Sequence, residues 1–138
     1  MLEESVLRRS DLRKCYDKIV KRYRRYGTIP STTTLINETV VSRAPGYYLT
    51  YDYARRLLSD FRHRRLRRKY NPLRRDMIRE IARKIDRMKR RHPDLSEGEA
   101  LTMVLSSCSA SRFFISPASA RRIINHKNTI NDNKNIMF

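Results

Sequence analysis

Apolar residues recur every three or four positions in two long segments of the chain, the spacing that places them on one face of a helix. They are Leu12, Cys15, Tyr16, Ile19, Val20 and Tyr23 in the first segment, and Ile78, Ile81, Ala82, Ile85 and Met88 in the second. Each segment ends in an arginine pair followed by a helix breaker, Gly27 in one and Pro93 in the other. Asn71 predicts the start of the second helix, because the proline after it is tolerated in a first turn.

A shorter helix is expected after each long one. The first begins near Thr28 or Ser31, and the second near Asp94 or Ser96. Ser96 with Glu99 matches a capping box, in which each side chain accepts a hydrogen bond from the backbone of the other. The buried sides contain the leucines at positions 35 and 101, and both helices stop in loops rich in Ser, Pro or Gly.

A third helix follows each short one. Residues 47–49 and 113–115 run aromatic, aromatic, aliphatic, which predicts a short extended segment, with one aromatic of each pair in the core. The other aromatic either packs against protein or stacks on nucleic-acid bases. Thr50 and Ser116 then fit the helix N-cap. The apolar faces are Ala54, Leu57, Leu58 and Phe61 in one helix, and Ala120, Ile123 and Ile124 in the other.

The pattern of three helices occurs twice in the sequence. Shifting the sequence by 66 aligns residues 7–58 with residues 73–124 without a gap, giving 13 identities in 52 pairs where composition alone gives roughly four. The predicted fold is mainly α, with two tandem, duplicated three-helix modules that each contain a short extended segment before the third helix. The predicted domains are residues 1–70, with a basic C-terminal extension, and residues 71–127, followed by a flexible tail at 128–138. At the level of architecture each module resembles a helix-turn-helix DNA-binding module.

The net charge of the chain limits the classes of partner that we expect. Lys and Arg number 32 against 14 Asp and Glu, so the net charge is +18 and the pI is about 10.8. Such a balance favours a polyanionic partner, which is DNA, RNA or an anionic membrane surface. The chain has no apolar run long enough to span a bilayer, and its first residues, MLEESVLRRSDL, do not match a signal peptide. We therefore expect a cytoplasmic protein associated with nucleic acid.

The densest charge lies where the modules join, in the run FRHRRLRRKY at 61–70 and the arginines after it. Its candidate phosphate contacts are Arg62, Arg64, Arg65, Arg67, Arg68, Lys69, Arg74 and Arg75. At the equivalent residues 128–135 the second copy has a single lysine, so the module fold does not need this charge. The alternatives are a phosphate-binding segment, which we favour, and a solvated helix face.

Other basic and polar positions complete the predicted interface. Arginine pairs early in the third helices are unfavourable for the helix dipole and therefore favour anion contact. Those pairs are Arg55-Arg56 and Arg121-Arg122, and the remaining predicted contacts are Thr32, Thr33, Asn37, Arg43 and Arg112. Thr and Asn on the short helix of copy one can reach base edges. The pairs ending the long helices, at 24–25 and 90–91, serve equally well as dipole partners or phosphate contacts.

Catalytic, metal and cofactor sites are not expected. Three histidines lack ligand spacing, three glycines form no phosphate-binding loop, and the two cysteines fit buried thiols. The leading prediction is a non-enzymatic protein that binds double-stranded DNA, without a cofactor or membrane partner. The alternatives are an RNA-binding protein, or a structural or adaptor protein of a virus or mobile element. The apolar short helix of the second copy, with Met103, Val104 and Leu105, favours a protein partner or self-association through the second module, residues 71–127.

Overall fold

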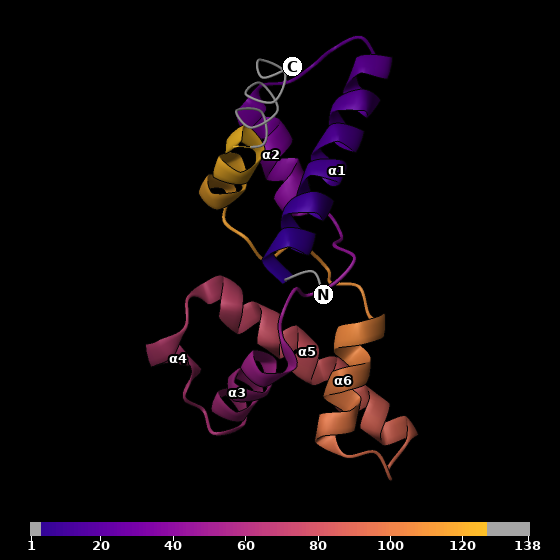
Figure 1. Ribbon diagram of the computed structural model, residues 1–138, viewed down its shortest axis with the longest axis vertical. Helices are drawn as coiled ribbons and strands as arrows, with labels where there is room; N and C mark the ends of the chain where they lie inside the picture. Colours follow the sequence, from indigo (N-terminus) through magenta and orange to yellow (C-terminus); the bar gives the residue numbers. More distant parts are fainter. Residues whose placement is uncertain (1–3, 127–138) are drawn as a thin grey trace, which may run out of the picture. The chain divides into compact units, whose positions relative to one another are not determined.

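The protein is all-α in the part of the chain that the structure describes. The computed structural model describes residues 4–126, apart from the side chains of residues 67 and 68, and these residues form no strand. The helices are α1 (Glu4–Arg25), α2 (Thr32–Val40), α3 (Tyr51–Arg62), α4 (Leu66–Lys69), α5 (Pro72–Arg91) and α6 (Glu97–Ser107). Residues 117–126 are also helical (Figure 1). The predicted tail at 128–138 lies outside the described residues.

The predicted helix starts are confirmed by their N-cap hydrogen bonds. The caps of α2, α3, α5 and α6 are Ser31, Thr50, Asn71 and Ser96, and each side chain accepts from the backbone N–H three residues later. Ser116 does the same for residues 117–126, where its Oγ accepts from the Ser119 N–H at 3.1 Å. The capping box of Ser96 and Glu99 is present, with both of its bonds. These caps satisfy backbone donors that have no partner within a helix.

Helix boundaries repeat at the offset found in the sequence. α1 and α5 end at Arg25 and Arg91, and the two third helices begin at residues 51 and 117. The segments before the third helices are not strands, because each bends sharply at its second aromatic residue. There the backbone is left-handed, with φ 59° at Tyr48 and 53° at Phe114. A segment with no neighbouring strand has no ladder to join, and this turn instead leads the chain into the helix cap.

Contacts between the helices divide the chain into two compact units that draw on both copies. Unit 1 is Met1–Ala44 with Ser111–Phe138, and unit 2 is Pro45–Ala110. The first unit therefore holds α1, α2 and the helical residues 117–126, while the second holds α3, α4, α5 and α6. The predicted division at residue 70 follows the repeat in the sequence, whereas each unit takes its first two helices from one copy and its third from the other.

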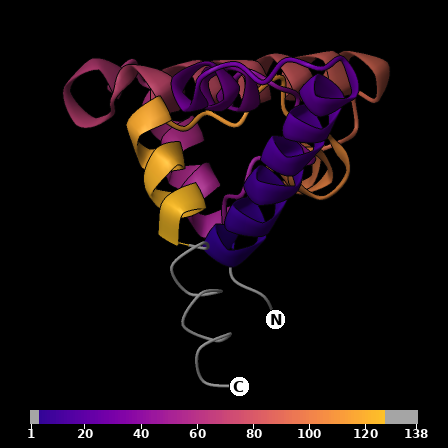
Figure 2. The same cartoon turned by 90° about the horizontal axis from the view of Figure 1, so that it is seen from above.

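Unit 1 has a core in which the late helix packs with the two earliest ones. Its buried side chains include Leu12, Ile19, Leu35, Ile36, Val40, Phe113, Ala120 and Ile124. The Phe113 N–H donates to the Val40 carbonyl at 3.2 Å, which ties the returning chain to the end of α2. Figure 2 shows the returning helix, in yellow, within this unit. Phe113 is 4% exposed and Phe114 only half-buried, which confirms that one aromatic of the pair lies in the core.

Unit 2 packs α3 against α5 and α6. Leu57, Ile78, Ile81, Ile85, Leu101 and Val104 are almost completely buried there. The Tyr47 hydroxyl donates to Glu80 Oε2 at 2.7 Å. Burial and this hydrogen bond together raise the pKa of Tyr47 well above its ordinary value, so the phenol stays protonated. In the first copy's α1 the position of Glu80 is Lys14, and in the second copy's segment Tyr47 is replaced by Phe113. The Tyr47 hydroxyl comes from the first copy and the Glu80 carboxylate from the second, and both lie in unit 2.

Candidate nucleic-acid interface

The residues predicted to contact nucleic acid fall into two groups, one in each unit. Unit 1 holds Thr32, Thr33, Asn37, Arg43, Arg112, Arg121 and Arg122. Unit 2 holds Arg55, Arg56, Arg62, Arg64, Arg65, Arg67, Arg68, Lys69, Arg74 and Arg75. Half of the net charge of +18 belongs to each unit. Each group is therefore described within its own unit.

In unit 1 the fold brings together predicted residues from opposite ends of the chain. Arg121 Nη2 donates to Thr33 Oγ1 at 2.8 Å, although the two residues are separated by 88 positions in the sequence. Thr32, Thr33 and Asn37 are exposed on α2, whose first turn contains no acidic residue. We call these three residues with Arg121 the α2 polar face. It presents hydroxyl, amide and guanidinium groups, the donors and acceptors that proteins use on base edges.

The other predicted residues of unit 1 lie beside that face or in the loops. Arg122 is exposed and donates to Ser119 Oγ at 3.1 Å within its own helix. The Arg112 guanidinium lies 5.0 Å from the centre of the Phe114 ring. Arg43 is exposed in the segment that follows α2.

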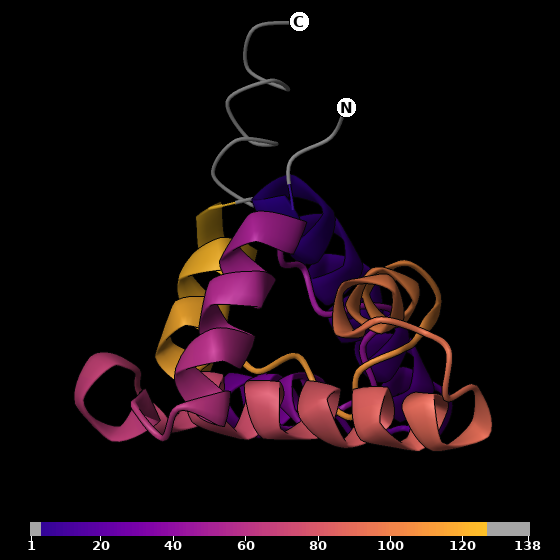
Figure 3. The same cartoon turned by 90° about the horizontal axis from the view of Figure 1, so that it is seen from below.

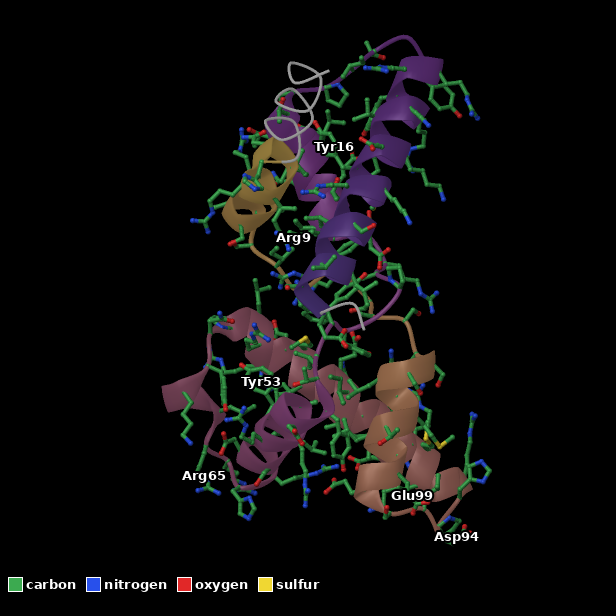
Figure 4. All side chains as sticks on the ribbon, viewed as in Figure 1. Arg9, Tyr16, Tyr53, Arg65, Asp94 and Glu99 are labelled. Atoms are coloured by element: carbon green, nitrogen blue, oxygen red, sulfur yellow. The ribbon has the colours of Figure 1, made fainter. Side chains whose placement is uncertain are left out.

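The basic run after α3 neither extends that helix nor forms a plain linker. α3 ends at Arg62, Arg64 adopts a left-handed φ of 59°, and the short α4 follows. Asp60, which is 8% exposed, organises the turn by accepting from the Tyr70 hydroxyl at 2.8 Å. Burial and this bond raise the pKa of Tyr70. The Arg65 N–H donates to the Asp60 carbonyl at 2.7 Å, and Figure 4 labels Arg65 in this turn.

Asp60 also offsets part of the charge of this run. The carboxylate lies 3.7 Å from both Arg65 Nε and Lys69 Nζ, and both cations are more than half exposed. Such exposed, long contacts hold the side chains weakly. Arg65 and Lys69 therefore remain accessible to another anion. Arg67 and Arg68 lie on α4.

Arg62 forms salt bridges within unit 2, so its guanidinium is not a free cation. Its Nη2 donates to Asp86 Oδ1 at 2.8 Å, and its Nε donates to Glu97 Oε1 at 2.9 Å. The Asp86 hydrogen bond raises the pKa of Arg62, partly against the effect of burial, and Glu97 adds to it. One guanidinium thus joins the end of α3 to α5 and to the first turn of α6. A phosphate at this position would have to displace two carboxylates.

The remaining predicted arginines of unit 2 surround α3. Arg56 and Arg74 lie over the Tyr53 ring, at 5.7 and 5.2 Å from its centre. Arg55 is exposed at a cavity of about 490 Å³ where α3 meets the start of α6. Arg75 is half-buried, and its Nε has no hydrogen-bond partner among the described residues.

Figure 3 shows helix α5 lengthwise. Sequence reasoning considered Arg90 at its end as a dipole partner or phosphate contact, but it missed the row of arginines along the helix. Four exposed residues share one face of this helix and form what we call the α5 arginine stripe. They are Arg79, Arg83, Arg87 and Arg90. The stripe lies opposite the buried Ile78, Ile81 and Ile85, so it faces away from the core. Its spacing of four, four and three residues was visible in the sequence and could have identified it.

Little internal negative charge opposes this stripe. Within the described residues only Arg79 of the four forms an ion pair, with Asp76 at 3.2 Å. A second set of exposed cations shares a face of α1. These are Lys14, Lys18, Arg22 and Arg25, of which Arg22 lies 3.4 Å from Glu38. Each unit therefore presents basic side chains along its longest helix.

The described side chains include no group of three His, Cys, Asp or Glu placed to hold a metal ion. No helix within residues 4–126 has the length and apolar character needed to cross a membrane. Comparison with protein-family models, curated proteins and solved structures finds no match for this chain.

Proposed function

We propose that this protein binds double-stranded nucleic acid, DNA in preference to RNA, mainly through contacts to phosphates and without a catalytic step. The observation that carries this proposal is the α5 arginine stripe. Four guanidinium groups lie on the side of the helix opposite the core, and within the described residues only one of them has an acidic partner. Neutralising phosphates with such cations releases condensed counterions, which favours binding.

The dimensions of the stripe suit an extended polyanion. At 1.5 Å of rise per residue, positions 79 to 90 span about 17 Å of the helix axis. A duplex carries one negative charge per about 1.7 Å of its axis, so several phosphates lie within that length. The stripe contributes nothing to the core, so apart from the ion pair of Arg79 with Asp76 its positive charge adds mainly self-repulsion to the folded unit. An anionic surface relieves that repulsion.

The proposal includes two duplicated, helix-turn-helix-like modules. It is supported by helix boundaries, N-caps and left-handed turns that recur at the same offset in both copies. In this proposal each module takes its third helix from the other copy. Unit 1 then contains α1, α2 and residues 117–126 as one module, and unit 2 contains α5, α6 and α3 as the other.

We assign any reading of sequence to unit 1. The α2 polar face offers Asn37 and Arg121, and side chains of these types make paired hydrogen bonds to adenine and guanine edges. The equivalent short helix of unit 2 begins with Glu97 and Glu99, which phosphates would repel. In this proposal the α5 arginine stripe and the exposed cations of α1 position the duplex, and the α2 polar face discriminates among sequences.

Two charge-matched variants test the proposal. In the stripe variant Arg79, Arg83, Arg87 and Arg90 become Gln, and in the junction variant Arg64, Arg65, Arg67 and Arg68 become Gln. Both remove four positive charges from unit 2. Affinity for a duplex is measured by fluorescence anisotropy over a range of salt, and far-UV circular dichroism confirms that both variants fold.

The stripe variant should lose more affinity than the junction variant. If all four arginines contact phosphates, the slope of log affinity against log salt should shrink by about 3.6 units. The loss should be similar for all duplex sequences, whereas Asn37→Ala should change the preference among sequences and leave the slope unchanged. A parent protein that binds no duplex at low salt, or variants that keep the parent slope, would refute the proposal. Preference for structured RNA in competition would reassign the partner.

A protein partner is the second candidate, favoured by the exposed side of α6. Thr102, Met103, Ser106 and Ser107 are exposed there and carry no charge, and Met103 is 43% exposed. Uncharged surface stands out on a chain in which a third of the residues are charged. This candidate would be supported if the chain captured one protein in a stoichiometric complex that persisted after nuclease treatment. The Met103→Glu variant should then fail to form that complex.

A further inference from the structure

The loop between α1 and α2 exposes two apolar side chains. Tyr26 is 77% exposed, the highest value for a large apolar residue in the described part of the chain, and Ile29 is 54% exposed. They are three positions apart in a loop that runs from the end of α1 to the cap of α2. Water-exposed apolar surface of this kind is unfavourable unless a partner covers it.

The loop holds Tyr26 in a defined position. The Tyr26 N–H donates to the Tyr23 carbonyl at 3.0 Å, and the Gly27 N–H donates to the Arg24 carbonyl at 3.1 Å. Gly27 has φ 83°, a left-handed conformation that ends the helix and that glycine adopts without strain. Ser31 then fixes the start of α2. Because these bonds already fix the backbone at Tyr26, binding there has less of the main chain to order.

Two arginines directly precede the exposed ring. Arg24 and Arg25 lie in the last turn of α1, are exposed, and form no ion pair within the described residues. Their neighbour Arg22 is held by Glu38 at 3.4 Å. Proteins that bind a nucleic-acid strand combine aromatic rings with nearby cations, since bases stack on the rings while phosphates meet the cations. The charge therefore favours a nucleic acid over an uncharged protein surface.

The second copy shows that the fold does not require this tip. Its equivalent loop joins α5 to α6 and has His92 in place of Tyr26 and Asp94 in place of Thr28. Leu95, which replaces Ile29, is half-buried, whereas Ile29 is exposed. The same pair of helices is thus connected without an exposed apolar tip, and the arginine pair before the loop is kept. The tip is a feature of unit 1 alone.

We propose that Tyr26 stacks on an unpaired or unstacked base, with Ile29 against the same base step and Arg24 and Arg25 on the neighbouring phosphates. This inference rests on the proposed function and deepens it, because it names the part of the nucleic acid that the loop recognises. The protein should therefore bind a duplex with a bulged base more tightly than the fully paired duplex.

The test uses the full chain and two DNA duplexes of the same sequence, one fully paired and one with a single bulged 2-aminopurine. Tyr26→Ala removes the ring, Tyr26→Phe keeps it, and His92→Ala makes the equivalent truncation in the second copy. Tyr26→Ala should lose roughly five- to 150-fold in affinity for the bulged duplex, the range expected for one stacked base. Its affinity for the paired duplex and its salt slope should not change. Tyr26→Phe and His92→Ala should bind as the parent does.

Stacking also has a direct signal, because 2-aminopurine fluorescence is quenched when the base stacks on an aromatic ring. Quenching should occur with the parent and with Tyr26→Phe, and should disappear with Tyr26→Ala. Equal affinity of Tyr26→Ala and the parent for the bulged duplex overturns this inference and leaves the proposed function intact. Absence of binding to both duplexes overturns the two together. Binding to phosphatidylserine vesicles that is lost in Tyr26→Ala, with unchanged DNA binding, overturns it in favour of a lipid surface.

Discussion

Two equivalent core substitutions test which helices belong together. Leu58 in α3 and Ile124 in residues 117–126 occupy the same position of the repeat, and they are 3% and 6% exposed. Leu58→Ala and Ile124→Ala each remove buried methyl groups, which costs about 2–5 kcal/mol. Because α3 packs on α5 and α6, that cost should fall on unit 2 for Leu58→Ala and on unit 1 for Ile124→Ala.

Residue-resolved hydrogen exchange can locate the loss. At about 2 kcal/mol the slowest amides of the affected unit should exchange roughly thirty-fold faster. Leu58→Ala should accelerate exchange in α5 and α6 and leave α1 and α2 unchanged, and Ile124→Ala should do the reverse. The measurement is made by NMR under conditions where exchange reports the opening free energy, with circular dichroism confirming that both variants are folded.

The opposite pattern would refute the grouping of the helices. Contiguous modules, each packing its own third helix, require Leu58→Ala to weaken α1 and α2 and to spare α5 and α6. An equal loss in all four helices would instead mean that the chain unfolds as one cooperative body, which contradicts the division at residues 44 and 110.

Four further substitutions each probe a single position by its effect on the urea midpoint. Tyr47→Phe copies the residue of the other repeat but removes the hydroxyl that donates to buried Glu80, so unit 2 should lose about 1–3 kcal/mol. Arg62→Gln should destabilise unit 2 by about 1 kcal/mol and leave the salt slope of DNA binding unchanged, because its partners are internal carboxylates; a smaller slope would contradict this. Gly27→Ala should be destabilising by about 1 kcal/mol because φ is 83°. Gly98→Ala should be neutral or stabilising, since it sits inside α6 and meets only the movable end of a tyrosine at 2.8 Å.

Local features were predictable from the sequence because neighbouring residues determine them. Ser96 and Glu99 form their capping box within a single turn, and Thr50 and Ser116 cap their helices with residues three positions away. The recurring pattern also located the third helices. None of these features requires knowledge of what packs against the helix.

The grouping of helices was not predictable, because the repeat makes the alternatives nearly equivalent. Ala54 and Ala120 are both fully buried, and Leu58 and Ile124 have similar size, so either third helix can fill either core. The sequence distinguishes the two arrangements only at small differences, such as the Tyr47 hydroxyl and the Glu80 carboxylate. Such a pair is informative only once both residues are known to share a unit.

The candidate interface was predictable in part. Density of charge identified the junction, where Arg62 is nevertheless occupied by Asp86 and Glu97, carboxylates more than twenty positions away. Charge density did not reveal the α5 arginine stripe beyond Arg90, because its charges are spaced along one helix face and do not form a continuous run. Thr33 and Arg121 were both named, but their contact depends on the return of the chain into unit 1.

The inserted position of unit 2 has a consequence for synthesis on the ribosome. α3 emerges directly after α1 and α2, and its proper partners α5 and α6 follow later, while residues 117–126 come last. At about 5–20 residues per second, roughly 3–13 s separate residue 62 from residue 126. During that interval α3 is the only third helix available to the apolar faces of α1 and α2, and its buried positions match those of the helix that finally occupies the place. The nascent chain can therefore form the contiguous arrangement first and must release α3 before the mature pairing is reached.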